Sequence, residues 1–291
     1  MTEAVTVVLG ASSQIGYFLI PALLAEGKQV VAVSRQSIPH WFRFYAQDPR
    51  LHWCNMEQLM RRELGVSVDF VSSGPLHLAV NLVAKLAPVK LIVMSSASVA
   101  FKQHSVDSTE RTQMAGIIQA EKKLTLWAEK NQRNLHILRP TLVYGCGLDQ
   151  NITRAASLIQ RFGFIPLAGQ ASGLRAPVHS HDLAKLIQQL LQQSPAGQFV
   201  WPLAGGSQLT YRQMLEYVFT ALDKPVRFVA LPFWLLRLLT RMAPAMNPQM
   251  INRQSQNLCV DDQAARAQLH WEPRSFELHK GDLFTASVVN P

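Results

Sequence analysis

The first half of the chain alternates short apolar runs with longer stretches in which apolar residues recur at helical spacing. Runs of strand-like composition occupy residues 5–10, 29–35, 51–54, 68–73, 90–96 and 135–140, and helical patterns occupy residues 14–27, 74–88 and 112–132. Strands that alternate with helices predict a parallel sheet covered on both faces, because each crossover lays a helix against the sheet. The sequence therefore predicts the doubly wound α/β class (a Rossmann fold), which binds its ligand at the carboxyl ends of the strands.

The pattern changes after Pro140, where glycine and proline become frequent and strand-like runs become shorter. Two helices are expected at residues 182–193 and 211–223, and Asp182 is expected to cap the first of them. We predict a Rossmann domain over residues 1–145 and a smaller substrate domain over residues 146–291, interleaved with the last elements of the sheet.

The bulk composition is that of a soluble globular enzyme. The 291 residues are 48% hydrophobic and 16% charged, and this length can bury one large core or a main domain with a smaller one. The apolar residues of the first segment continue into a glycine turn, which predicts a first strand rather than a signal peptide. No apolar run reaches the roughly 18 residues that span a bilayer. The three cysteines are far apart, so we expect reduced, buried thiols and a cytoplasmic protein.

A formal net charge of +9 raises the question of an anionic partner. Most basic residues are dispersed among acidic ones, and the chain has neither zinc-finger spacing nor an aromatic RNA-binding signature, which argues against nucleic acid. Residues 224–260 differ, because five lysines and arginines fall there without an aspartate or glutamate. Within this stretch we predict an amphipathic helix over 231–242, which either packs its leucines on the core or contacts an anionic membrane surface or a protein partner. The pattern predicts no oligomeric state.

The turn after the first expected strand reads Gly-Ala-Ser-Ser-Gln-Ile-Gly over residues 10–16. A dinucleotide-binding turn needs one residue that turns tightly, one that lets a phosphate approach the backbone and one that lets the helix pack closely on the sheet. Gly10 and Gly16 fit the first and last needs, and Ser13 replaces the middle glycine with a hydroxyl that can donate to a phosphate. We expect a dinucleotide to be bound by Gly10, Ser12, Ser13, Gln14, Ile15 and Gly16. The alternative is a tight turn that binds no ligand.

The second expected strand ends in Ser34-Arg35, which bears on the choice of dinucleotide. NAD-binding proteins place an acidic residue here for the ribose 2′-hydroxyl, whereas an arginine nearby suits the 2′-phosphate of NADP. The forked guanidinium also matches the geometry of a phosphate. We predict NADP as the cofactor, contacted by Ser34 and Arg35, with NAD as the alternative.

Five motifs, taken in order, resemble those of a known family. They are the glycine turn, LIVMSSASV at 91–99, LHILRPTLVYG at 135–145, LRAPVHSHDLAKLI at 174–187 and DDQAARAQLHWEPRSF at 261–276. The chain resembles the extended short-chain dehydrogenases/reductases, and within them the NAD-dependent epimerase/dehydratase group.

The resemblance implies a Rossmann domain followed by a substrate domain, and it suggests roles for individual residues. It implies a catalytic hydroxyl at Ser96. The residues it places beside the cofactor are Ser95, Pro140, Thr141 and Tyr144. It also places Arg175, His179 and Asp182 at the junction of the domains, where we expect His179 and Asp182 to be structural rather than catalytic.

The chain departs from this family at its acid/base. The family uses a Tyr-x-x-x-Lys pair on the long helix, in which the tyrosine is the acid/base and the lysine lowers its pKa and holds the ribose. No tyrosine of this sequence is followed by lysine four residues later, and the expected positions hold Gln113 and Ile117. Asn55 also stands where the family commonly has an aspartate near the adenine. These departures predict an atypical member.

Two classes of function remain open. The first is an atypical NAD(P)-dependent reductase or epimerase for a small polar or nucleotide-linked substrate, in which Ser96 hydrogen-bonds the substrate and His104 transfers the proton. Lys102 is a weaker candidate, because an exposed lysine stays protonated. The second is a non-catalytic NADP(H)-binding sensor, scaffold or assembly factor, in which Ser96 only orients a ligand.

Overall fold

The computed structural model describes residues 4–103, 105, 107–167, 169–230 and 253–285. Within them lies a seven-stranded sheet of parallel neighbours in the order β11-β6-β5-β4-β1-β2-β3. Its strands are β1 (Val5–Leu9), β2 (Val30–Val33), β3 (Leu51–Cys54), β4 (Val68–Ser72), β5 (Lys90–Met94), β6 (Asn134–Pro140) and β11 (Gln198–Leu203). The first six coincide with the expected apolar runs, and the predicted doubly wound α/β class is confirmed.

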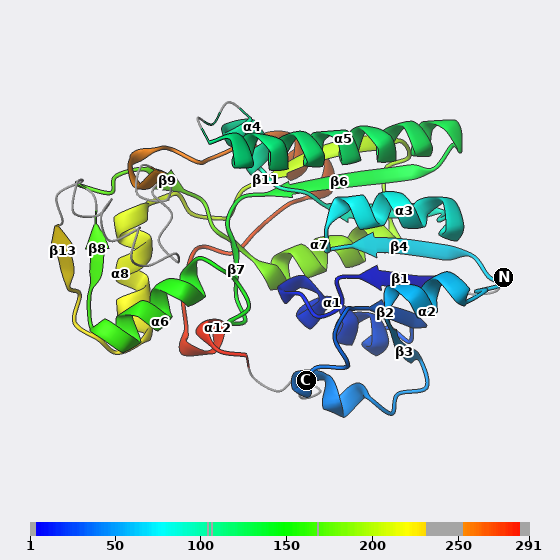
Figure 1. Ribbon diagram of the computed structural model, residues 1–291, viewed down its shortest axis with the longest axis horizontal. Coiled ribbons are helices and arrows are strands. Elements are labelled where there is room, and N and C mark those ends of the chain that lie inside the picture. The colour runs from blue at the N-terminus through cyan, green and yellow to red at the C-terminus, as the bar shows by residue number, and fades with distance from the viewer. Residues whose placement is uncertain (1–3, 104, 106, 168, 231–252, 286–291) are drawn as a thin grey trace.

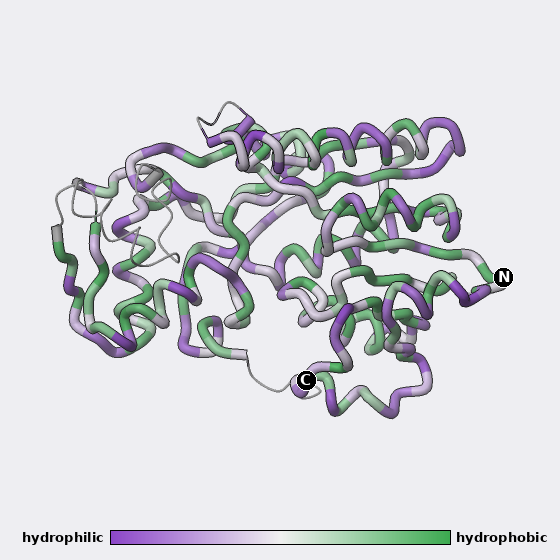
Figure 2. The backbone as a smooth tube through the Cα atoms, in the orientation of Figure 1, coloured by the Kyte–Doolittle hydropathy of each residue, from purple (hydrophilic) through white to green (hydrophobic). Residues whose placement is uncertain are grey.

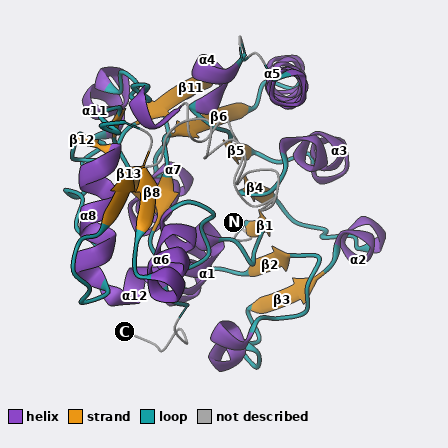
Figure 3. Cartoon of the chain, turned by 60° about the vertical axis from the view of Figure 1, so that its left-hand side comes forward, coloured by secondary structure: helices purple, strands orange, loops and turns teal. Residues whose placement is uncertain are grey.

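Helices cover both faces of this sheet (Figure 1 and Figure 3). One face buries apolar side chains of α1 (Gln14–Ala25), α7 (Ser180–Gln192) and α11 (Gln263–Leu269). The other face buries those of α2 (Met56–Arg61), α3 (Leu76–Leu86) and α5 (Ser108–Lys130). Figure 2 shows hydrophobic strands inside and polar outer turns on α5. Because both faces are covered, the strands read as continuous apolar runs.

A second group of elements forms its own core beside the sheet, on the left of Figure 1. It comprises α6 (Ile152–Phe162), α8 (Tyr211–Ala221), α12 (Lys280–Leu283), the pair β8 (Ile165–Leu167) and β13 (Phe228–Ala230), and the pair β9 (Leu174–Arg175) and β12 (Leu209–Thr210). The remaining elements of the described residues are shorter: η1 (His40–Tyr45), α4 (Ser98–Lys102), β7 (Val143–Tyr144), β10 (Val178–His179) and η2 (Arg253–Ser255). The smaller core faces the sheet's carboxyl edge, so a ligand site can form between the two.

The chain returns to the sheet after building part of this second group. Helix α7 packs along α1, and β11 pairs with β6 over its full length. The sequence pattern did not predict β11, because one side of this edge strand is exposed and it contains Pro202. The element that closes the sheet is therefore the one with the weakest strand signal.

One expected helix cap is wrong, and one expected helix cannot be compared. Helix α7 begins at Ser180, and its N-cap is His179, whose ring nitrogen Nδ1 accepts a hydrogen bond from the amide of His181 at 3.1 Å. Asp182 instead lies within the first turn. The helix expected over 231–242 lies outside the described residues. Across the described segments, none of the helices combines the length and the apolarity needed to cross a bilayer.

Candidate active site

The glycine turn joins β1 to α1 next to the point where the strand order reverses, between β1 and β4. Gly10 has a φ of +83°, and a Cβ added there would lie 2.7 Å from the amide nitrogen of Gly74. A Cβ added at Gly16 would lie 2.2 Å from the carbonyl oxygen of Ala11. Neither position has room for a side chain, so the turn has the close backbone packing of a dinucleotide-binding turn.

Ser13 occupies the position of the middle glycine and has a structural use. Its Oγ accepts a hydrogen bond from the amide of Gly16 at 3.1 Å, which caps α1, and it lies 2.9 Å from the Oγ of Ser73. The Ser73 hydroxyl in turn donates to the carbonyl of Gly10 at 3.2 Å. Ile15 is buried in the core. Ser13 thus ties the turn to the end of β4, and the first amides of α1 remain the groups suited to an anion.

The end of β2 opens onto a cavity of about 460 Å³, here named the β2 cavity. Ser34 is buried, and its Oγ lies 3.0 Å from that of Ser12. The exposed Arg35 lines the cavity together with Trp53 and Asn55. The predicted arginine therefore lies beside a space large enough for part of a ligand.

Asn55 has a local structural role as well as a place in this wall. It forms a reciprocal capping box at the start of α2: its Oδ1 accepts from the amide of Gln58, and its own amide donates to Oε1 of Gln58, both at 2.9 Å. The departure from the family's aspartate is thus compatible with a well-capped helix.

The ends of β5 and β6 hold Ser96 at the carboxyl edge of the sheet. The amide of Ser95 donates to the carbonyl of Leu138 at 2.7 Å, and that of Ala97 donates to the carbonyl of Pro140 at 3.0 Å. The Oγ of Ser96 accepts from the amide of Ser98 at 3.1 Å. Ser96 is half-buried and lines two cavities, which meet at this residue.

The first of these, here named the α3–α5 cavity, has a volume of about 430 Å³. It lies between the first turn of α3, the end of β5 and one face of α5. Gln113 and Ile117 line it together with Ser95 and Ser96. The positions expected for the tyrosine and the lysine therefore do face Ser96, but an amide and an aliphatic side chain cannot transfer a proton.

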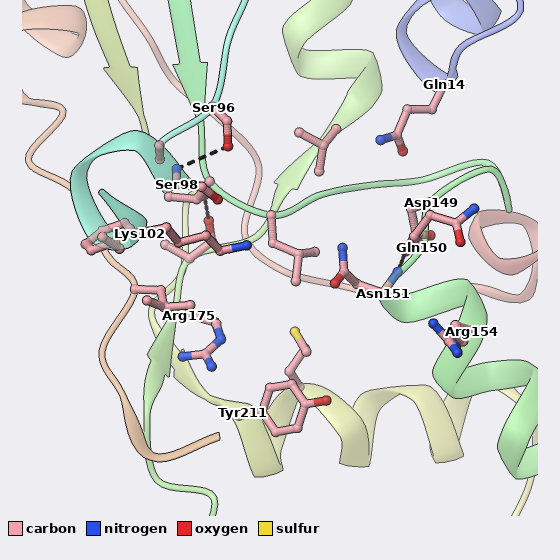
Figure 4. Close-up of a pocket in the computed structure, with 18 of the residues that line it drawn as sticks. Gln14, Ser96, Ser98, Lys102, Asp149, Gln150, Asn151, Arg154, Arg175 and Tyr211 are labelled. Atoms are coloured by element: carbon pink, nitrogen blue, oxygen red, sulfur yellow. Dashed lines mark hydrogen bonds between the residues drawn. The ribbon is translucent and has the colours of Figure 1, made fainter. Parts of the chain in front are cut away.

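The second, here named the junction cavity, has a volume of about 640 Å³ and separates the sheet from the smaller group of elements (Figure 4). Side chains from both sides surround it, among them Gln14, Ser96, Lys102, Asn151, Arg154, Arg175 and Tyr211. A molecule in this cavity would contact both parts of the fold.

The two carboxylates in the junction cavity are engaged by other groups of the protein. Glu110 accepts from the hydroxyl of Ser105 at 2.8 Å and forms an ion pair with Lys102 at 3.8 Å. Asp149 accepts hydrogen bonds from backbone amides at the start of α6, with distances of 2.6 and 2.8 Å to those of Ile152 and Asn151. Both carboxylates are therefore held by hydrogen bonds within the protein.

The arginines of this cavity shift its balance toward positive charge. The Arg175 guanidinium lies over the ring of Tyr211, 5.3 Å from its centroid, and donates to the carbonyl of Gln256 at 2.6 Å. Arg154 comes from α6 on the other side of the cavity (Figure 4). Together with Lys102, these arginines outnumber the two carboxylates of the cavity, which favours an anionic ligand.

Several residues from the family motifs hold the chain together at the junction. Burial raises the pKa of Tyr144 above its ordinary value, and its hydroxyl donates to the carbonyl of Glu277 at 3.3 Å. Tyr144 does not line the cavities described above. Nε2 of His179 lies 3.2 Å from Oδ1 of Asp282. Burial by itself raises the pKa of Asp282, but the hydrogen bonds from His179 and from the His279 amide outweigh it and hold that pKa below its usual range.

Asp182 anchors the carboxyl-terminal segment rather than capping α7. Its carboxylate accepts from the Arg274 guanidinium at 2.8 and 3.0 Å and from the Arg274 amide at 3.0 Å. The hydroxyl of Thr141 donates to the carbonyl of Ala176. These contacts give both residues structural roles.

His104, the expected proton-transfer residue, lies outside the described residues. The sequence reasoning overlooked Arg154 and Tyr211, which no motif marks. Their only local signal is that each stands close to the start of a helix that follows a loop. They line the same cavity as Ser96 because the smaller group packs against the sheet, which local sequence patterns do not report.

Comparison with known proteins agrees with this geometry. No family model matches the chain. A curated relative, UDP-glucose 4-epimerase from Vibrio cholerae, is 26% identical over 155 residues, which span 53% of this chain and 47% of that protein. The match thus covers about half of each.

Solved structures align over nearly the whole chain. A dTDP-glucose 4,6-dehydratase from Bacillus anthracis, in complex with NAD, has a TM-score of 0.70 at 15% identity and covers 96% of this chain and 94% of its own. A UDP-glucuronic acid 4-epimerase from Bacillus cereus, also with NAD, has a TM-score of 0.67 at 14% identity and covers 93% and 94%. An epimerase from Methanothermobacter thermautotrophicus has a TM-score of 0.73 at 12% identity and covers 97% and 90%.

The chain has the fold of the extended short-chain dehydrogenases/reductases. The predicted resemblance to their epimerase/dehydratase group is confirmed, because both the curated relative and these structural neighbours are epimerases or dehydratases. Within this extended short-chain dehydrogenase/reductase fold, Gln113 and Ile117 replace the expected pair at the wall of the α3–α5 cavity.

Proposed function

We propose that the protein binds a nicotinamide dinucleotide, NADP(H) in preference to NAD(H), and acts as a reductase or epimerase on a nucleotide-linked substrate. The observation that carries this proposal is the glycine turn beside the strand-order reversal, where a Cβ at Gly10 or Gly16 would collide with backbone atoms. Two of the structural neighbours are complexes with NAD, which supports a nicotinamide cofactor for this protein.

The described residues fit such a cofactor along the carboxyl edge of the sheet. The turn at residues 10–16 and the first amides of α1 would hold the pyrophosphate. Ser34 and Arg35 would contact the adenosine end through the β2 cavity, and Ser95 and Pro140 would lie near the nicotinamide end. When bound, the nicotinamide would supply hydride transfer.

The junction cavity supports a substrate that carries phosphate. Arg154 and Arg175 supply positive charge, and guanidinium groups pair well with phosphate oxygens. The relatives are named for UDP- and dTDP-linked sugars. In this proposal Ser96 hydrogen-bonds the reacting carbonyl or hydroxyl, because its Oγ lies where the two cavities meet.

Replacing Arg35 by alanine is expected to weaken NADP(H) binding about ten- to a hundredfold and to leave NAD(H) binding nearly unchanged. The reason is the loss of a charge-assisted contact that only the 2′-phosphate makes. Equilibrium titration of both cofactors by intrinsic fluorescence measures the difference. Arg161→Ala, which removes an exposed arginine from α6, is the matched control. Equal affinities for the two cofactors in the wild type, unchanged by Arg35→Ala, would contradict the preference for NADP.

The test of catalysis is turnover of UDP-glucose, dTDP-glucose and a panel of carbonyl compounds with NADP(H) and NAD(H). Ser96→Ala is expected to lower turnover about ten- to a hundredfold with cofactor affinity unchanged, because a substrate hydrogen bond is lost. Ser157→Ala on α6 is the control for removal of a hydroxyl. A wild-type rate in Ser96→Ala would show that Ser96 has no part in turnover.

A second candidate function is a non-catalytic NADP(H)-binding sensor, scaffold or assembly factor. The observation that favours it is the replacement of the acid/base pair by Gln113 and Ile117 at the α3–α5 cavity. Tight NADPH binding without turnover of any of these compounds would support this second function over the first.

A further inference from the structure

The α3–α5 cavity contains a titratable residue that the family motifs do not assign. Among the described residues that line this cavity, His77 has the one titratable side chain. It lies in the first turn of α3, and its side chain is exposed. It therefore stands where a ligand and solvent protons both have access.

The polar groups of this cavity come from three different elements. His77 belongs to α3, Ser95 and Ser96 follow β5, and Gln113 belongs to α5. The Oγ of Ser95 is buried and, within the described part of the chain, has no hydrogen-bond partner. The rest of the lining is mainly apolar, with Leu76, Met94 and Ile117. A few polar groups converging in an apolar wall are typical of a ligand site.

Three other candidate proton donors of the described residues are engaged in contacts of their own. Lys102 forms an ion pair with Glu110 at 3.8 Å. Tyr144 is buried, with its hydroxyl on the carbonyl of Glu277. His179 faces Asp282 and caps α7. His77 differs from His179 in that it is not a helix cap. The N-cap residue of α3 is Pro75, which makes no side-chain hydrogen bond.

We propose that His77 is the proton-transfer residue of this site and takes over the role of the missing tyrosine, a proposal that rests on the proposed reductase or epimerase function. In oxidation, the imidazole of His77 would accept the hydroxyl proton of a substrate alcohol. A bound, oxidised nicotinamide would supply the acceptor for the hydride from the same carbon, and the product would be a carbonyl. Reduction runs the same steps in reverse, with the imidazolium returning the proton to oxygen. Imidazole is the side chain that most often serves as general acid or base.

Gln113 completes this arrangement as a positioning residue. Its amide can donate to the substrate oxygen but cannot exchange a proton with it at neutral pH. Ser96 supplies a second donor at the same cavity. In this arrangement His77 on α3 transfers the proton, while Ser96 after β5 and Gln113 on α5 orient the substrate.

The test compares His77→Ala with the wild-type full-length protein, using UDP-glucose, dTDP-glucose and the carbonyl panel as probes. Turnover is expected to fall about a hundredfold or more, with the dissociation constant of NADPH within about twofold of the wild type. Added imidazole is expected to restore part of the rate, which a merely structural residue would not allow. His52→Ala, an exposed histidine on β3 outside the α3–α5 cavity, is the control.

A second measurement does not depend on turnover. Diethyl pyrocarbonate modifies accessible histidines, and peptide mass spectrometry reports each site. NADPH is expected to protect His77 and to leave His52 unprotected. Equal modification of His77 with and without NADPH would overturn its place beside the cofactor.

The outcomes separate the two proposals. If the wild type turns over a probe and His77→Ala does so at the same rate, His77 is not the proton-transfer residue, and the proposed function stands. Loss of both NADPH binding and turnover in His77→Ala, without rescue by imidazole, would also overturn its role. A wild type that binds NADPH but turns over none of the probes overturns both proposals and supports the sensor.

Discussion

Replacing Gly16 by alanine is expected to lower the free energy of unfolding by about 3 kcal/mol and to abolish tight NADP(H) binding. A Cβ at this position would lie 2.2 Å from the carbonyl oxygen of Ala11 and 2.8 Å from its carbonyl carbon. Both are backbone atoms, so the strain cannot be relieved by turning a side chain, and overpacking of this kind costs about 1–3 kcal/mol or more. The start of α1 must shift, and with it the amides suited to the pyrophosphate.

Chemical denaturation and NADPH titration of Gly16→Ala measure the two effects. Gly281→Ala on α12 is the matched control, because a Cβ there meets no atom within 4 Å and the residue lines none of the cavities described above. That change is expected to raise stability by about 0.5–1 kcal/mol, since alanine is the better helix former. Wild-type stability and affinity in Gly16→Ala would contradict the close packing on which the cofactor site depends.

The second large effect is a loss of stability in acid that comes from His136 on β6. His136 is buried, and its Nδ1 accepts from the indole N–H of Trp201 on β11 at 3.0 Å. Its ring also stacks on Phe199. The pKa of His136 is lowered to about 4, chiefly by burial and to a smaller extent by the charge of Lys90, while a hydrogen bond to the backbone of Pro195 partly opposes this shift. The folded protein, in which β6 pairs with β11, therefore favours the neutral form of the His136 ring.

The sign of the pH effect follows from this lowered pKa. Between about pH 6.5, the ordinary value for histidine, and pH 4, the unfolded chain binds a proton at this residue and the folded protein does not. Stability therefore falls as the pH is lowered through this window and does not fall further from His136 below pH 4. A shift of this size corresponds to up to about 3 kcal/mol.

His136→Gln tests this contribution, because a glutamine carbonyl can still accept from Trp201 but cannot be protonated there. Between pH 7 and pH 4 the wild type is expected to lose up to about 3 kcal/mol more than the variant in urea unfolding experiments. His270→Asn is the control, since His270 is exposed and its φ of +50° suits asparagine. Parallel pH profiles for wild type and His136→Gln would rule out this source of acid sensitivity.

The sheet could be read from the sequence because its strands are buried on both faces. Runs such as residues 5–9 and 90–94 are continuous and apolar, and the structure places both in the middle of the sheet. The glycine turn could also be predicted from the sequence, because neither Gly10 nor Gly16 has room for a side chain. Both the buried strands and the glycine turn depend on residues that are close together in the sequence, so the sequence pattern predicts them.

Features set by long-range packing could not be predicted in the same way. The strand β11 lies at an edge, with only part of its side chains buried. Asp182 looks like a helix cap by sequence, but Arg274, far along the chain, takes its carboxylate. His77 was not a candidate, because nothing in its neighbourhood along the chain connects it with Ser96 or Gln113. Only the crossing of α3, β5 and α5 brings the three to one cavity.

The late return of the chain to the sheet has a consequence for synthesis on the ribosome. While residues 141–179 are being synthesised, β11 and α7 do not yet exist. The edge of β6 that pairs with β11 and the apolar face of α1 that packs on α7 therefore have no partner at this stage. A nascent chain ending near Gly145 thus exposes an unpaired strand edge and an uncovered helix, both of which favour aggregation. Chaperones that hold such surfaces are expected to bind the growing chain until residue 203 has left the exit tunnel.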